Sequence, residues 1–193
     1  MSIERAFDEH ERVVSESRAL VPKVREMAEI VRRCLGSGGK LLVCGNGGSA
    51  ADAQHFAAEF IGRFVKERAA LPAIALTTDT SALTALANDY AFEIVFARQI
   101  HALARPGDVV IALSTSGRSP NVVAAARAGR ERGCKVVALT GAGGGPLGEA
   151  ADLLVAVPSK DTARVQEVHE LCLHAVVQEV EKSLFPDPSG ETS

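Results

Sequence analysis

The sequence predicts an α/β protein built on a parallel sheet that is flanked by helices. Two observations lead to this prediction. Five short apolar runs recur along the 193 residues, a length typical of one domain, and segments with helical periodicity separate them. Strands that alternate with helices are typical of a doubly wound parallel sheet, whose strands are buried on both faces and are therefore apolar throughout.

The first 38 residues precede any predicted strand and have the apolar periodicity of two helices. Pro22 suits the first turn of the second helix, where its missing N–H leaves no hydrogen bond unmade. Gly36 and the glycines that follow it provide the left-handed conformation in which helices often end. We expect the two helices to run antiparallel, and either to pack on the body of the protein or to mediate subunit assembly.

The remaining predicted elements alternate along the chain. Strands are predicted at 40–44, 71–76, 108–113, 135–140 and 153–157. Helices are predicted at 49–62, 80–103, 119–132 and 162–184, with the second one broken near Asn88 and Asp89. We therefore expect one domain over 1–185, with N-terminal helices over 1–38 and an α/β core with a C-terminal helix over 39–185, followed by a flexible tail over 186–193.

Composition argues against several classes of function. The net charge of −3 and the aromatic content of 4% argue against a nucleic-acid partner. No apolar run reaches the roughly 18 residues of a membrane span, and the charged N-terminus has no apolar segment of a secretory signal. The four cysteines are scattered without metal-binding spacing, so we expect free, buried thiols and a cytoplasmic location.

Glycines follow the first predicted strand. The segment from Gly45 to Ala50 allows close backbone approach and places N–H groups at the start of a helix, which favours an anionic ligand. It also has the spacing of a dinucleotide site, but Asp79 lies too far along the chain to hold a ribose. The alternative is a tight turn between a strand and a helix.

Hydroxyl side chains follow the third predicted strand, just before a helix. They belong to Ser114, Thr115, Ser116 and Ser119. One hydroxyl, that of Ser119, would suffice to cap the helix with Pro120 in its first turn, so the other three exceed what a cap needs. Since ligands of such sheets bind at the carboxyl ends of the strands, the two loops together predict a sugar-phosphate pocket.

Two helices carry polar residues at intervals of four, and therefore along one face of each helix. These residues are His55, Glu59 and Arg63 in one helix and Gln166, Glu170 and His174 in the other. Imidazoles and carboxylates from two helices can hold a divalent metal, most naturally zinc. Glu59 and His174 could also serve as a general acid/base pair. The plainer alternative is a solvated polar face with ion pairs.

Most of the chain resembles the sugar isomerase (SIS) domain family, and within it the phosphoheptose isomerases. The matching segments are CGNGGSAADAQHFAAEFIGRF (44–64), PAIALTTDTSALTALANDYAFE (72–93), GDVVIALSTSGRSPNVVAA (107–125), VVALTG (136–141) and RVQEVHELCLH (164–174). The resemblance implies a five-stranded, flavodoxin-like parallel sheet and a homotetramer with active sites at subunit interfaces. It also implies an aldose–ketose isomerase that converts D-sedoheptulose 7-phosphate to D-glycero-D-manno-heptose 7-phosphate through an enediol. This reaction is the first step toward the heptose of bacterial lipopolysaccharide and other envelope glycans.

The resemblance also assigns roles to individual residues. It implies phosphate ligands at Ser49, Ser114, Thr115, Ser116 and Ser119, and sugar contacts at Asn46, Gly47, Gly48, Asn88 and Asp89. It implies one zinc ion per subunit at His55, Glu59, Gln166 and His174. Glu59, Arg63 and Gln166 are further substrate contacts, with Arg63 reaching across an interface. Glu59 and His174 correspond to the catalytic acid/base pair, with either one as the base, whereas Ala163 replaces an acidic residue of some members.

A different function occurs in the same family. One branch contains a non-enzymatic protein that binds the replication initiator DnaA, and the chain resembles it along much of its length. That branch lacks the carboxylate at the position of Glu59 and the imidazole at the position of His174, and both are present here. The enzyme is therefore the favoured interpretation. A regulatory sugar-phosphate-binding domain is less expected, because no DNA-binding segment is evident.

Overall fold

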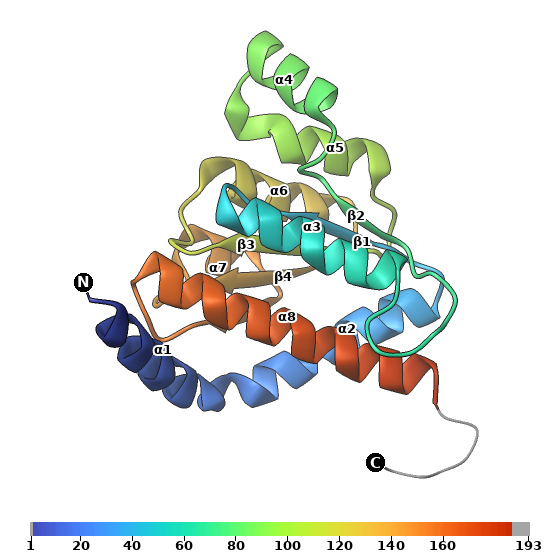
Figure 1. Cartoon of the computed structure of the whole chain (residues 1–193). Helices are drawn as coiled ribbons and strands as arrows, with labels where there is room; N and C mark the ends of the chain where they lie inside the picture. Colours follow the sequence, from blue (N-terminus) through green and yellow to red (C-terminus); the bar gives the residue numbers. More distant parts are fainter. Residues whose placement is uncertain (1, 187–193) are drawn as a thin grey trace.

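The computed structural model describes residues 2–186, in which five parallel strands form one sheet (Figure 1). The strands are β1 (Leu41–Cys44), β2 (Ala73–Ala75), β3 (Val109–Ser114), β4 (Lys135–Thr140) and β5 (Leu153–Ala156). Their order is β2-β1-β3-β4-β5, so the strand order reverses between β1 and β3. The predicted flavodoxin-like sheet is confirmed, with strand ends within about two residues of those expected. The predicted tail, apart from Pro186, lies outside the described residues.

Helices connect the strands and precede the first of them. They are α1 (Ile3–Ser17), α2 (Val21–Gly36), α3 (Gly48–Ile61), α4 (Thr80–Asp89), α5 (Val95–Leu103), α6 (Pro120–Glu131), α7 (Gly145–Ala150) and α8 (Thr162–Leu184). Short 3-10 turns, η1 (Arg18–Leu20) and η2 (Phe92–Ile94), precede α2 and α5. The break predicted in the 80–103 segment is present. The sequence does not predict α7, because GPLGEA is too short and too rich in glycine to show a helical period.

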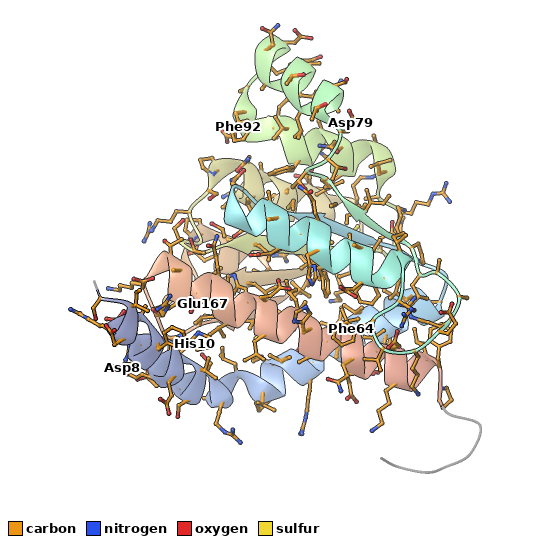
Figure 2. The ribbon with its side chains drawn as sticks, viewed as in Figure 1. Asp8, His10, Phe64, Asp79, Phe92 and Glu167 are labelled. Carbon is orange, nitrogen blue, oxygen red and sulfur yellow. The ribbon has the colours of Figure 1, made fainter. Side chains whose placement is uncertain are left out.

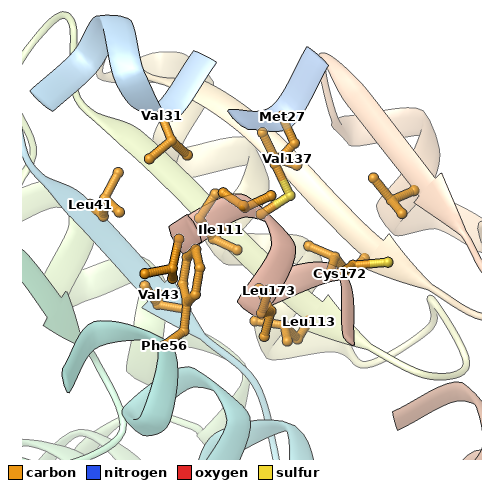
Figure 3. Close-up of a cluster of buried hydrophobic side chains, with 14 of the residues drawn as sticks. Met27, Val31, Leu41, Val43, Phe56, Ile111, Leu113, Val137, Cys172 and Leu173 are labelled. Carbon is orange, nitrogen blue, oxygen red and sulfur yellow. The ribbon is translucent and has the colours of Figure 1, made fainter. Parts of the chain in front are cut away.

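Helices bury both faces of the sheet. α2, α3 and α8 pack on one face, and α5, α6 and α7 pack on the other (Figure 1). Alternate residues of β1 enter the two cores, with Leu41 and Val43 in the first and Leu42 and Cys44 in the second. In the first core, Phe56 of α3 lies beside Val43 (Figure 3). The continuous apolar runs of the sequence reflect this double burial.

The two N-terminal helices are not antiparallel, contrary to the prediction. α1 leads through η1 into α2 along one curved path beneath α8 (Figure 1). The reason is local, because residues 18–20, Arg-Ala-Leu, keep a helical backbone and contain neither glycine nor proline to reverse the chain. His10 of α1 and Glu167 of α8 face each other (Figure 2), with Nδ1 and Oε2 2.7 Å apart. This contact fixes α1 to the start of α8.

A buried ion pair anchors the segment between α3 and β2. Arg68 Nε lies 3.0 Å from Glu181 Oε1 of α8, and both side chains are at most 3% exposed. Glu181 also accepts the backbone N–H groups of residues 64–66, and Arg68 donates to the carbonyl of Glu59 near the end of α3. Burial by itself raises the pKa of Glu181, but these donors outweigh it and the pKa is lowered.

The fold also bears on the compartment and membrane predictions. Among residues 2–186, no helix combines the length and the apolar character needed to cross a membrane. The four cysteines are free and buried, as the sequence predicts. Burial raises the pKa of each thiol, to about 12 for Cys44, so these side chains are protonated and unreactive at neutral pH.

Candidate active site

The loops after β1 and β3 meet at the carboxyl edge of the sheet. Asn46 of the first loop and Asn121 of α6 exchange two hydrogen bonds, in which each amide NH2 donates to the other amide oxygen at 2.8 and 2.9 Å. Asn121 is only 2% exposed. Because an amide both donates and accepts, this reciprocal pair satisfies the two side chains together. The pair therefore fixes the position of one loop relative to the other.

The glycine loop brings backbone N–H groups to the start of α3. Gly47 has a φ of +57° and is the N-cap, so no side chain caps this helix. Gly48 allows a close contact, since a Cβ there would come within 2.9 Å of the amide carbon of Gln166 and that side chain would have to move. Gln166 of α8 thus lies against the first turn of α3, in which Ser49 is buried. Asp79 lies at the start of α4 (Figure 2) and caps that helix, which agrees with its exclusion as a ribose ligand.

Three hydroxyls of the loop after β3 lie close together. Ser114 Oγ is 3.0 Å from Ser119 Oγ and 3.4 Å from Ser116 Oγ. Ser119 occupies the N-cap position of α6, but its side chain makes no capping hydrogen bond. The carbonyl of Thr115 accepts the N–H of Gly141, which ties this loop to the end of β4. Hydroxyls beside a helix N-terminus that they do not cap are suited to phosphate oxygens.

Two imidazoles and two carboxylates face one another between α3 and α8. His55 and Glu59 come from α3, and Glu170 and His174 come from α8. The Nε2 atoms of His55 and His174 lie 2.8 Å apart, and Glu170 Oε1 lies 3.1 and 3.0 Å from them respectively. Glu59 Oε1 is more distant, at 3.5 Å from His55 Nε2. The ring of Phe64, from the anchored segment, lies beside that of His174, with the centroids 5.5 Å apart and the planes tilted by 30°.

This donor set fits a zinc ion. Imidazole nitrogens and carboxylate oxygens are common ligands of zinc, and those of His55, Glu170 and His174 lie within 4.8 Å of one another. Within the described chain, Glu170 Oε2 and Asp52 Oδ2 are buried without a hydrogen-bond partner. Burial raises the pKa of Asp52 to about 6; the charge of Glu170 adds to this rise and His55 opposes it. A cation would offset the negative charge gathered here.

This chain is similar to known proteins in sequence and in structure. The sequence profile of the SIS domain matches residues 7–141. The chain belongs to the SIS domain family. The phosphoheptose isomerase of Roseiflexus sp. is 58% identical over 166 residues, which cover 86% of this chain and 84% of the relative. Phosphoheptose isomerase 1 of Campylobacter jejuni is 50% identical over 181 residues, which cover 94% and 97% of the two chains.

Solved structures of phosphoheptose isomerases share this SIS fold. The Neisseria gonorrhoeae protein has a TM-score of 0.89 and 47% identity, and the match covers 93% of this chain and 97% of that one. The Francisella tularensis protein has a TM-score of 0.91 and 38% identity, with coverage of 93% and 96%. NanR of Vibrio vulnificus, at 19% identity and a TM-score of 0.68, shows the likeness of the fold alone.

Two predicted sugar contacts of this SIS domain lie apart from the cluster of imidazoles and carboxylates between α3 and α8. Asn88 and Asp89 are exposed at the end of α4, where the Asn88 amide donates to the Asp89 carboxylate at 2.8 Å. Here α4 packs on η2 and α5 and stands away from the sheet (Figure 1). We call this projection, residues 80–94, the α4 arm. The described chain thus does not bring Asn88 and Asp89 to its own imidazoles.

Arg63 is also separate from the cluster of this SIS domain. The sequence predicts a polar stripe of His55, Glu59 and Arg63 along one helix, and this prediction is wrong for its third member. Helix α3 ends before Gly62, whose ψ of −119° is not helical, so the spacing of four no longer places Arg63 on that face. Arg63 Nε instead lies 3.6 Å from Glu67, and its side chain is 59% exposed.

Three residues of the site are absent from the set to which the resemblance assigns roles. Glu170 has a sequence signal, its spacing of four from both Gln166 and His174, but the resemblance assigns it no role. Asn121 directly follows the hydroxyl loop and Pro120, where nothing in the pattern distinguishes it from a solvated side chain. Asp52 is one of many acids in the sequence, and only the packing of α3 against α8 shows that its carboxylate is shielded from solvent.

Proposed function

We propose that this chain is a phosphoheptose isomerase, which converts D-sedoheptulose 7-phosphate to D-glycero-D-manno-heptose 7-phosphate. The observation that carries the proposal is an imidazole–carboxylate cluster beside a hydroxyl loop, in a chain 50–58% identical to named phosphoheptose isomerases. Ser49 and His55 are separated by roughly 9 Å along α3, at about 1.5 Å per residue. This separation suits a ligand with its phosphate at one end and its reacting carbons at the other.

The chemistry requires one proton to move between C1 and C2 of the sugar through an enediol. The carbon acid is weak, so a base must contact it, and the oxygens must exchange protons as well. We assign the carbon proton to Glu59 and the oxygen protons to His174. A zinc ion bound at the cluster would supply polarisation of the carbonyl and enediolate oxygens. Phe64, beside His174, and the anchored segment that carries it would hold the imidazole in orientation.

The other predicted contacts belong to the same proposal. Ser49, Ser114, Thr115, Ser116 and Ser119 would bind the phosphate, and Asn46, Gly47, Gly48 and Gln166 would contact the sugar. Their support is their position on the two loops at the carboxyl edge of the sheet, where ligands of such folds bind. Zinc is proposed at the imidazoles of His55 and His174, with Glu59 and Gln166 as the further ligands that the resemblance implies. Because a lone pair cannot bind a cation and accept a proton at once, Glu59 and His174 would shift their ligation when they move protons.

We also propose that the protein assembles as a homotetramer. The support is apolar surface left open in the described chain. A groove of about 400 Å³ between α2 and α8 is lined by side chains that include Val21, Val24 and Leu171. On the α4 arm, Tyr90 and Phe92 are 61% and 58% exposed. Apolar patches of this kind are typical of subunit contacts.

Domain organisation, location and partners complete the proposal. One domain over residues 1–185 is supported by the single sheet that both hydrophobic cores share. A cytoplasmic location is supported by the four free thiols, since disulfides are typical of oxidising compartments. The partners in this proposal are a sugar phosphate and further copies of the chain, and the net charge of −3 argues against nucleic acid or an anionic membrane surface.

The alternative, a non-enzymatic SIS protein that binds the replication initiator DnaA, has less support. The groups that this branch lacks, the carboxylate of Glu59 and the imidazole of His174, are both present and both belong to the cluster. The relatives named above are isomerases.

The proposal is tested by incubating the protein with sedoheptulose 7-phosphate in D2O and following the products by NMR. We expect an aldose product that carries deuterium at C2, because the enediol takes its proton from a base that exchanges with solvent. We expect Glu59→Gln to bind inorganic phosphate as the wild type does and to give neither product nor exchange at carbon. A folded wild-type protein without product or exchange would refute the enzyme and direct attention to an initiator pull-down.

A further inference from the structure

His169 of α8 is a fully buried imidazole that the proposed chemistry does not use. Its Nε2 lies 3.1 Å from the carbonyl oxygen of Thr140, the last residue of β4. Because a carbonyl only accepts, Nε2 carries the proton of this hydrogen bond, and Nδ1 is left as an acceptor. Within residues 2–186, this Nδ1 is buried without a hydrogen-bond partner. Burial lowers the pKa of the imidazole to about 4, although the Thr140 carbonyl opposes the shift, so the ring is neutral.

The hydrogen bond from His169 is not needed to satisfy the strand. The Thr140 carbonyl also accepts the N–H of Val157 at 2.9 Å, so it would keep a partner without the imidazole. The unpartnered Nδ1 is itself a cost, since a buried acceptor has given up its hydrogen bonds to water. An apolar side chain of similar size would avoid this cost. Stability therefore does not explain an imidazole at this position.

The place of His169 on α8 points to a different explanation. Gln166 and His174 lie on the face of this helix that is turned toward the proposed site. His169 is three residues after Gln166, which puts it about 60° around the helix axis from it, at the border between that face and the core. Apolar contacts are not directional, whereas a hydrogen bond requires both a distance and an angle. The bond to Thr140 thus fixes the rotation of α8 where the site residues project from it.

Thr140 belongs to the strand end that also holds the hydroxyl loop. It pairs with Ser114 in the register of β3 and β4, and the next residue, Gly141, donates its N–H to the carbonyl of Thr115. A Cβ on Gly141 would come within 2.6 Å of that carbonyl oxygen and 3.2 Å of Val165 Cγ2 of α8. The loop and the helix therefore meet at the end of β4 without room for a side chain between them.

We propose that His169 is a positioning residue, which holds Gln166 and His174 at a fixed distance from the hydroxyl loop through its hydrogen bond to Thr140. Its effect on turnover rests on the proposed function, whereas the hydrogen bond and its tautomer do not. A small displacement of α8 would leave the phosphate bound and would move the imidazole of His174 away from the sugar oxygens. Displacements of about 1 Å can lower a rate about 100-fold. We therefore expect the loss of this hydrogen bond to lower kcat rather than affinity.

The test begins with His169→Leu, which removes the donor and the unpartnered acceptor at a similar volume. We expect kcat for sedoheptulose 7-phosphate to fall at least about tenfold, with KM and the affinity for inorganic phosphate within about threefold of the wild type. The midpoint of thermal unfolding should be equal to that of the wild type or higher, because no buried group loses its last partner. His169→Gln, whose amide can donate to the same carbonyl, should restore kcat to within about threefold of the wild type.

The matched control is Val176→Ala, a change further along α8 in the same core. Val176 is fully buried, and its truncation removes apolar contacts but no hydrogen bond. We expect this variant to unfold at a midpoint at least about 4 °C lower and to keep kcat within about threefold, in assays well below the unfolding transition. Stability and activity would then respond to different residues of one helix, which a merely structural role of His169 does not produce.

The ¹⁵N NMR signals of the imidazoles provide a readout that does not depend on isomerase activity. The chain has five histidines, and comparison with His169→Gln identifies the signals of His169. We expect a slowly exchanging proton on Nε2 and an unprotonated Nδ1, because the ring is buried and its N–H is hydrogen-bonded.

The proposal is overturned by an unchanged kcat in His169→Leu, by a kcat in His169→Gln as low as in His169→Leu, or by a ring protonated at Nδ1. An equal loss of kcat in Val176→Ala would also overturn it, since activity would then simply follow the packing of α8. The expected NMR signals in a protein that does not turn over sedoheptulose 7-phosphate would refute the proposed function and leave the hydrogen bond established. Turnover by the wild type and by His169→Leu at the same rate would refute the positioning role alone.

Discussion

Asn121 holds Asn46 in place although it has no assigned role of its own. It is 2% exposed, and its amide exchanges two hydrogen bonds with Asn46 across the loops after β1 and β3. Truncating either residue leaves a partly buried amide without its partner, which typically costs about 1–3 kcal/mol. Because Asn46 is a proposed sugar contact, Asn121 is a positioning residue that acts through it.

We expect Asn121→Ala to lower kcat/KM for sedoheptulose 7-phosphate by about tenfold, the equivalent of about 1.4 kcal/mol. Asn46→Ala should cause a similar loss or a greater one. The double variant should lose little more than the worse single variant, since two residues in one hydrogen-bonded pair are not independent. Steady-state kinetics of the three variants provide the measurement. Losses that simply add would show that the two amides act separately, and would contradict the pairing.

The individual residues also show what a sequence cannot convey. The spacing of Glu170 and His174 is visible in the sequence, and so is the excess of hydroxyls from Ser114 to Ser119. That Glu170 stands closer to His55 than Glu59 does depends on the rotation of α8 against α3, which is set by core packing. No local pattern encodes that rotation. Sequence therefore identifies the chemistry of this edge of the sheet, and packing decides which carboxylate meets which imidazole.

At the scale of the elements, the buried ion pair of Arg68 and Glu181 anchors the segment between α3 and β2, and this ion pair is sensitive to acid. The pKa of Glu181 is lowered in the folded protein by the amide donors and Arg68. A carboxyl group whose folded pKa is depressed stabilises the fold above its unfolded pKa of about 4.3, and this contribution is lost as the pH falls through the folded pKa. We expect the free energy of unfolding of the wild type to fall more steeply below about pH 4.3 than that of Glu181→Gln.

At neutral pH, Glu181→Gln leaves the buried guanidinium of Arg68 without its counter-charge. We expect a loss of about 3–5 kcal/mol in the free energy of unfolding, because removing one partner leaves an uncompensated buried charge. Urea unfolding followed by far-UV circular dichroism provides the measurement, since the chain has no tryptophan and one tyrosine. Parallel pH profiles for the wild type and Glu181→Gln would contradict the role of this carboxylate.

The helices and strands differ in how far their sequence specifies them. The five strands are predictable because burial on both faces requires continuous apolar runs, such as residues 135–140. The connection of α1 to α2 is not predictable in this way. The prediction of two antiparallel helices relies on Pro22 and on the glycines after α2, and neither describes the turn at residues 18–20. A sequence of ordinary helix-forming residues permits both a reversal and a continuous path. In the continuous path both helices pack on α8, where Val13 of α1 is buried in the core and His10 faces Glu167 (Figure 2).

At the scale of the whole molecule, a single chain does not bring together all the residues of its proposed site. The hydroxyl loop and the imidazole–carboxylate cluster lie within the chain, but Asn88 and Asp89 are on the α4 arm, away from both (Figure 1). No residue of α4 itself is buried. A helix of this kind, followed by exposed Tyr90 and Phe92, is typical of an element that a partner covers. The sequence does not predict which surface covers α4, because its periodicity reports contacts within one chain.

If a second copy covers the α4 arm, then Asn88 and Asp89 of one chain serve the cluster of another, and two inactive variants should complement each other. Glu59→Gln lacks the base, whereas a chain with Asn88→Ala and Asp89→Ala lacks the arm contacts. A mixed oligomer contains some sites that combine an intact arm from the first variant with an intact base from the second. With random mixing, about one quarter of the sites should be complete.

The two variants can be co-expressed with different affinity tags and purified through both tags, so that only mixed oligomers remain. We expect about a quarter of the wild-type isomerase activity in this preparation, and almost none in either variant alone. The matched control is Glu59→Gln carrying both tags on separate chains, which has the same assembly and no complete site. A mixed oligomer as inactive as this control would mean that each arm serves its own chain. The interface would then be the groove between α2 and α8, with α4 free to move toward the sheet when substrate binds.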